Sequence, residues 1–258
     1  AFSRLAGETS SSVAEVIRAQ LAARTIFAVA RGELALHELG LPAETELHVR
    51  VTWQQMIERA TRWLLHNRRG HLDIKGEASD FTDPVAMVLS LFETSGTPRQ
   101  RRLMAAEETN LTQAGVPRNL AWAVARAPWA HQALAIVDLA RRLDRPLELV
   151  VDVYYELAGV LGLDLVFDRV NQLERRSRWD TMARAALRDD LQSLHAALTR
   201  AALEAAPGAF DPDTVIAAWT KAVGGVDREA AELAEITSED STLARMSVAL
   251  RTIRTLLV

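Results

Sequence analysis

Residues 178 to 205 read RWDTMARAALRDDLQSLHAALTRAALEA, and this stretch decides the fold class because it carries helical periodicity without a glycine or proline. Asp180, Arg184 and Arg188 form a charged ladder along it. Its leucines recur at a helical spacing suited to close packing against another helix: Leu187, Leu191, Leu194 and Leu198. We therefore expect one long helix with an apolar face.

An earlier helix is expected to begin after Ser12. Ser12 and Glu15 match the capping-box pattern, in which each side chain binds the free backbone N–H of the other residue. Val13, Ile17 and Leu21 then follow at intervals of one helical turn and form an apolar stripe. We expect this stripe, like the leucines above, to lie mostly inside the protein.

Proline and glycine divide the rest of the chain into further helices. A helix is expected over residues 43–68, and others from about 227–236 and 240–257. Further helices should begin at these pairs: Asp83-Pro84, Thr97-Pro98, Val116-Pro117, Arg145-Pro146 and Asp211-Pro212. Alternating strand patterns and Asn-Gly or Asp-Gly hairpin turns are nearly absent. The pattern predicts an all-α fold, an irregular bundle of about ten helices with no sheet.

Pro207-Gly208 is the clearest break late in the chain. It predicts a main helical bundle over residues 1–206 and C-terminal helices over residues 207–258, packed on the same domain. The chain has 258 residues, of which 49% are apolar, and this is enough to bury a sizeable core.

The composition argues against several classes of function. A net charge of −4 argues against nucleic acid as a partner. The absence of cysteine excludes disulfides and cysteine-based metal sites. A signal peptide is not expected, because the first residues lack a basic segment followed by an apolar one. A membrane span is not expected, because the most apolar stretch, residues 147–167, is interrupted by acidic residues. A cytoplasmic location fits these features, and a start at Ala1 without Met is typical of an excised segment.

The basic residues are unevenly chosen, since all but Lys75 and Lys221 of the 30 are arginines. GC-rich coding explains this bias without any function. Selection of arginine for bidentate contacts to anions is the alternative.

No catalytic motif is found. The sequence lacks a P-loop, G-x-S-x-G and H-E-x-x-H, and it has no strand that a dinucleotide-binding glycine loop could follow. Asp189, Asp190 and His195 could suggest acid–base chemistry, but a helix places His195 off the face of the aspartates. We therefore predict no catalytic, cofactor-binding or metal-ligating residue in this segment.

One basic cluster is the candidate binding surface. Its members are expected to receive an anion or a carboxylate of another domain: Arg62, His66, Arg68 and Arg69, with Arg184 and Arg188 on the long helix. The alternative for the first group is the ordinary basic end of a helix, where cations are favoured.

Several segments together resemble the C-terminal region of the large bacterial NAD-dependent glutamate dehydrogenases. They are TRWLLHNRR (61–69) with LDI (72–74), AGVPRNLAWAVA (114–125) with ALAIVDLA (133–140), RWDTMARAALRDDLQSLHAALT (178–199) and RAQLAARTIF (18–27). The resemblance covers nearly the whole chain and is weakest after Pro207.

The resemblance implies that a parent enzyme oxidatively deaminates L-glutamate to 2-oxoglutarate and ammonia with NAD, using motifs upstream of this region. The segment itself would be a non-catalytic helical domain for assembly or regulation, without a cofactor of its own. Its partners would be its own catalytic domain and neighbouring subunits of a homo-oligomer. The alternative from the residues alone is an autonomous helical module that binds an effector or a partner helix.

Overall fold

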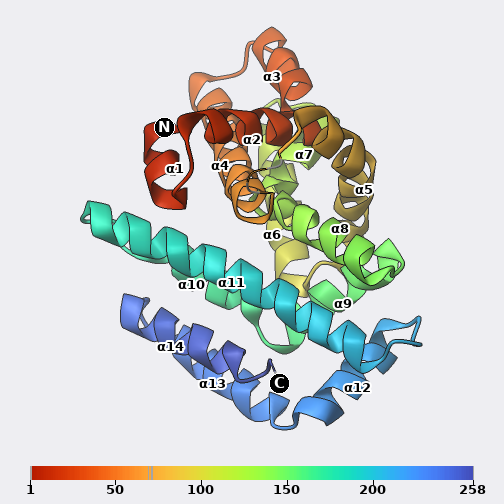
Figure 1. Cartoon of the computed structure of the whole chain (residues 1–258). Coiled ribbons are helices and arrows are strands. Elements are labelled where there is room, and N and C mark those ends of the chain that lie inside the picture. Colours follow the sequence, from red (N-terminus) through yellow and green to blue (C-terminus); the bar gives the residue numbers. More distant parts are fainter. Residues whose placement is uncertain (1, 69, 71, 258) are drawn as a thin grey trace. The chain divides into compact units, whose positions relative to one another are not determined.

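The computed structural model describes residues 2–68, 70 and 72–257, and in these residues it contains fourteen α-helices and no strand. The predicted all-α class is confirmed. The helices are α1 (Phe2–Thr9), α2 (Val13–Ile26), α3 (Val29–Glu38), α4 (Ala43–Asn67), α5 (Ile74–Ser95), α6 (Pro98–Gln113), α7 (Arg118–Ala130), α8 (Gln132–Leu143), α9 (Leu147–Val160), α10 (Leu163–Gln172), α11 (Arg178–Ala205), α12 (Pro212–Val223), α13 (Val226–Ser238) and α14 (Leu243–Arg254) (Figure 1).

The helices fall into two compact units. Unit 1 contains the residues up to Ser90 together with Arg101–Val137, and unit 2 contains Leu91–Gln100 together with the residues from Asp138 onward. The boundary between the units falls within α5, α6 and α8. The division expected at residue 206 stays a prediction.

Helix α4 is the centre of unit 1 and contacts α1, α2, α3 and α7. Its bounds confirm the helix predicted over residues 43–68. The buried face contains these apolar side chains: Val49, Trp53, Met56, Ile57, Ala60, Trp63, Leu64 and Leu65. Because each fully buried large side chain stabilises a fold by about 1.5–3 kcal/mol, α4 is the main apolar support of this unit.

Helix α11 has the same role in unit 2, where it contacts α9, α10, α12 and α14. Leu191 and Leu198 are fully buried, Leu194 is 7% exposed and Leu187 is half-buried. The burial expected for this stripe is therefore confirmed for three leucines. Ser177 caps the helix in a capping box with Asp180.

Most of the predicted helix starts are found, and one is wrong. Thr97 and Gln100 form a reciprocal capping box at α6, and Asp211 accepts the N–H of Thr214 at α12. Pro84, however, lies inside α5 and does not begin a helix. The helix begins earlier because Asp73 accepts the N–H groups of its first turn, and its buried phenylalanine and valine side chains continue past the proline.

The predicted number of helices was too low, because one break lacks the residues that usually signal it and two short helices were not expected. Ala28 separates α2 from α3 with a φ of 49°, a left-handed conformation that is rare for alanine. Gly162, with a φ of 62°, begins the separate helix α10 and is not simply an end of α9. Helix α1 was not expected at all.

The stripe on α2 is the clearest failure of the burial prediction. Val13, Ile17 and Leu21 are 45%, 40% and 49% exposed. The face of α2 that packs against α4 instead contains mostly small residues: Val16, Ala19, Ala22, Ala23 and Ile26. The three alanines let the two helix backbones approach closely, and Val13, Ile17 and Leu21 lie on the exposed side of α2.

Candidate functional site

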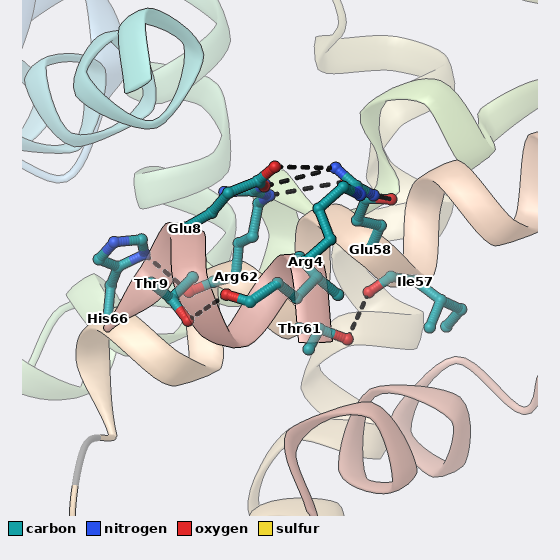
Figure 2. A network of polar contacts seen from close by, with 9 residues as sticks. Arg4, Glu8, Thr9, Ile57, Glu58, Thr61, Arg62 and His66 are labelled. Carbon is teal, nitrogen blue, oxygen red and sulfur yellow. Dashed lines mark hydrogen bonds and ion pairs between the residues drawn. The ribbon is translucent and has the colours of Figure 1, made fainter. Parts of the chain in front are cut away.

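The predicted basic cluster begins with Arg62, which takes part in a buried network of ion pairs between α1 and α4 (Figure 2). Arg62 is 2% exposed and pairs with Glu8 of α1 and with Glu58, one turn back on α4, at 3.7 Å. Arg4 completes the network, with 2.7 Å to Glu58 and 3.3 Å to Glu8. Two arginines and two glutamates therefore balance one another.

This network explains how a short helix is held in place. Only Leu5 and Thr9 of α1 are buried, and the Thr9 hydroxyl donates a hydrogen bond to the carbonyl of Leu5 within the same helix. The ion pairs are therefore the main specific contacts that fix α1 on α4. Since Glu8 already neutralises the Arg62 guanidinium in a desolvated site, an outside anion would have to displace this carboxylate.

The exposed end of α4 carries the next members of the cluster. The Nδ1–H of His66 donates to the carbonyl of Arg62 at 2.8 Å. Arg68 lies 3.2 Å from Glu77 and stacks on the rings of Trp63 and Phe81, at 5.3 and 5.4 Å from their centroids. Arg69 lies outside the described residues.

The last two candidates belong to α11 in unit 2. The guanidinium of Arg184 donates to the carbonyl of Asn171 at 2.8 Å, at the end of α10. Arg188 is half-buried one turn further on. The structure therefore assigns Arg62, His66 and Arg68 to unit 1 and Arg184 and Arg188 to unit 2, each of the two groups in contact with its own helices.

Other arginines make the same kind of contact as Arg184. Arg145 donates to the carbonyl of Pro207 at 2.9 Å, just beyond α11, and Arg169 donates to Thr237 at 2.7 Å near the end of α13. Arg59 donates to Pro128 at 2.7 Å. The last carbonyls of a helix lack partners within the helix, and the guanidinium fork can reach several of them. The arginine bias was the only sequence signal for these caps.

His195 is not an acid–base partner of the nearby aspartates. Its Nε2–H donates to the backbone carbonyl of Tyr154 at 2.8 Å, and its ring stacks on Tyr154 with 3.5 Å between centroids. Burial lowers the pKa of His195 to about 4, so the ring is neutral at pH 7. Asp190 instead pairs with Arg254 at 3.2 Å.

One pocket of about 340 Å³ lies in unit 1 beside the end of α4. Its lining mixes both signs of charge, with Arg18 and Arg68 against Glu15 and Asp73. The sequence identified only Arg68 of these residues as a binding candidate, because the other three come from a different helix and a loop. A lining of this kind suits a small ligand with both an anionic and a cationic group.

The described part of the chain has neither a cluster of metal ligands nor a membrane-spanning helix. No group of three or more histidine, aspartate or glutamate residues is arranged to hold a metal ion. No helix in the same residues has the length and apolarity to cross a membrane.

Comparison with known proteins identifies the family. A family model described as glutamate dehydrogenase, C-terminal, matches residues 1–255. The chain is 28% identical to NAD-specific glutamate dehydrogenases of Halomonas elongata, Mycobacterium tuberculosis and Pseudomonas aeruginosa. The alignments cover 84%, 97% and 93% of the chain, respectively.

The same alignments cover 14%, 16% and 15% of the three relatives, so the chain spans about one sixth or less of their length. The resemblance predicted from the sequence is thereby confirmed, because the family model extends over nearly every residue and the relatives carry the expected description. This chain belongs to the glutamate dehydrogenase C-terminal family.

Proposed function

We propose that this chain is the C-terminal helical domain of a longer NAD-dependent glutamate dehydrogenase. In this proposal the preceding part of the polypeptide binds NAD and converts L-glutamate to 2-oxoglutarate and ammonia. The observation that carries the proposal is the family match over residues 1–255 combined with the small share of each relative that the chain covers.

The domain itself would supply no catalytic group and no cofactor site, and would act in the assembly or regulation of a cytoplasmic homo-oligomer. One feature of the described residues supports this role. Arg62 of α4 and His195 of α11 are buried and bind other parts of their own unit. Such contacts stabilise a fold and do not prepare a group for proton transfer.

A contact with the catalytic domain or a neighbouring subunit would use the accessible members of the basic cluster. His66 is exposed and the Arg68 side chain is 21% exposed, whereas the Arg62 side chain is 3% exposed. We propose His66 and Arg68 as the described members that contact another domain, with Arg62 supporting them from inside unit 1. Arg69, which lies outside the described residues, and Arg184 and Arg188 of unit 2 stay predicted contact residues.

The proposal is tested by comparing the full polypeptide with the isolated chain. We expect the full polypeptide to reduce NAD in the presence of L-glutamate, and the isolated chain to show no turnover under the same conditions. Deletion of the chain from the full polypeptide should change the number of subunits in the oligomer, as measured by light scattering. Turnover by the isolated chain would overturn the non-catalytic role.

The pocket in unit 1 supports a second candidate function, that of an autonomous module that binds a small effector. A ligand that binds only the folded state raises the melting temperature, and the shift grows with the ratio of the free ligand concentration to its Kd. Melting curves of the isolated chain with amino acids, nucleotides and 2-oxo acids would test this function. Arg18→Ala removes a cation of the lining from an exposed position, so any shift should shrink in this variant.

A further inference from the structure

Helix α2 exposes three large aliphatic side chains in one line. Val13, Ile17 and Leu21 lie one helical turn apart and are each at least 40% exposed. We call these three residues the α2 outer stripe. Single exposed aliphatic residues are common on protein surfaces, but a continuous line on one helix face is typical of an interaction surface.

The two faces of α2 are reversed relative to an ordinary surface helix. Its buried face contains Ala19, Ala22 and Ala23 with Val16 and Ile26, whereas Val13, Ile17 and Leu21 lie on the exposed face. Helix α2 packs on α4 within unit 1 (Figure 1). A surface helix normally places its large apolar residues inward and polar residues outward. A helix that is apolar on both faces is typical of the interior of a larger protein.

The outer face carries little charge. Its exposed positions besides the stripe are Ala14, Arg18 and Thr25, so Arg18 is the one charged residue among them. In the part of the chain that the structure describes, Arg18 makes no hydrogen bond or ion pair. A partner surface for this face would therefore be apolar and would place a carboxylate near Arg18.

The size of the stripe favours a partner on the same polypeptide. The stripe extends over about 12 Å of helix, because α-helices rise 1.5 Å per residue. A stable complex between separate proteins buries about 800 Å² on each partner, which is far more than one such stripe provides. A covalently linked partner needs less area because its effective concentration is high.

We propose that the α2 outer stripe packs against the part of the same polypeptide that precedes this chain. The inference rests on the proposed function, in which a long catalytic region comes before residue 1, as the coverage of the relatives suggests. The stripe begins four residues after the end of α1, close in sequence to the point where that region would join. The partner surface is apolar and carries an acidic residue for Arg18.

Site-specific photocrosslinking in the full polypeptide tests this assignment. Benzoylphenylalanine would replace Leu21 in one variant and Ile17 in another, and the control would carry it at Asn110, an exposed position in a polar part of α6. After irradiation we expect crosslinked peptides from the preceding region, in a product that keeps the mass of one polypeptide on a denaturing gel. The control should give at most one tenth of this yield.

The other outcomes overturn the assignment. A product with the mass of two polypeptides would identify a neighbouring copy as the occupant, and equal low yields at all three positions would show that the stripe faces water. Glutamate oxidation by the same preparation separates these failures from a failure of the proposed function. If the polypeptide oxidises glutamate but forms no crosslink, only the assignment of the α2 outer stripe is wrong. If the polypeptide does not oxidise glutamate, the proposed function itself is wrong.

Discussion

Helices α2 and α11 carry similar apolar stripes in the sequence but bury them differently. In α11 the leucines at 191, 194 and 198 lie inside unit 2, whereas in α2 the equivalent residues point outward from unit 1. The difference comes from the face of each helix that lies opposite its apolar stripe. Helix α2 has a second apolar face, rich in alanine, that fits closely against α4, while α11 has a charged face with Asp190 and Arg200. An apolar stripe therefore predicts burial only where the rest of the helix is polar.

The largest effect should come from a charge in the buried stripe of α11. Leu191→Asp removes a fully buried side chain and places an unpaired carboxylate among α9, α11 and their neighbours. We expect a loss of at least about 5 kcal/mol in the free energy of unfolding, or no folded protein. Urea unfolding of the purified chain measures this loss. Leu191→Met, which conserves volume, should cost less than about 1.5 kcal/mol.

A smaller loss is expected from the charged contact that joins α1 to α4 in unit 1. Arg62→Met keeps the apolar length of the side chain but leaves Glu8 buried without its main partner. Removal of one member of a buried ion pair costs about 4 kcal/mol. Arg4→Met, at a residue whose side chain is 43% exposed, should cost less than about 1 kcal/mol. Equal losses in the two variants would contradict the central role of Arg62.

The buried face of α11 should also make stability depend on pH. Burial holds the pKa of His195 at about 4 in the folded chain, below its ordinary value of 6.5. Between these values the unfolded chain binds a proton that the folded chain does not, so stability is full above pH 6.5 and falls as the pH falls toward 4. The total loss is about 3 kcal/mol.

The pH effect is measured as a difference between two proteins. Unfolding by urea at several values between pH 7.5 and 4.5 gives the slope for the parent chain and for His195→Phe. The variant loses the hydrogen bond to Tyr154, so it should be less stable than the parent at pH 7.5, but its slope should be shallower. Parallel slopes would show that His195 does not titrate as its burial requires.

The sequence predicted the fold class and most helix ends because these depend on local patterns. The capping boxes at Ser12 and Ser177 are formed as expected, since a cap needs only residues within one turn. The break at Ala28 could not be predicted, because alanine favours a helix and its left-handed conformation is imposed by tertiary packing. The helix start predicted at Pro84 was wrong for the same reason, since burial of the apolar side chains of α5 outweighs the cost of a proline inside the helix.

The candidate site was predicted in composition but not in its contacts. The basic residues near the end of α4 could be identified from the sequence, but their partners come from distant segments. Glu8 lies 54 residues before Arg62, and no local pattern joins them. The arginine caps at helix ends were missed for this reason, although the excess of arginine over lysine was visible.

Helices α2 and α11 should lose similar amounts of stability when their N-terminal caps are removed, because both begin with a capping box. Ser12→Ala in α2 and Ser177→Ala in α11 each remove the acceptor for an N–H of the first turn. We expect each substitution to cost about 1 kcal/mol. Thermal unfolding would detect both losses, and Ser12→Asp should restore most of the loss at α2. A loss at one cap alone would show that the other helix is held by packing and not by its cap.

The smallest loss of stability is expected for a charge in the α2 outer stripe. This small loss, set against the large loss for Leu191→Asp, is the most direct test of the difference between α2 and α11. Leu21→Asp changes a residue that is 49% exposed, so the free energy of unfolding of the isolated chain should change by less than about 0.5 kcal/mol. Asn110→Asp, at an exposed polar position of α6 away from this face, is the control. If the stripe packs against the preceding region, Leu21→Asp but not Asn110→Asp should lower the melting temperature of the full polypeptide. A large loss in the isolated chain would instead mean that Leu21 belongs to the core of unit 1, and the contrast with α11 would disappear.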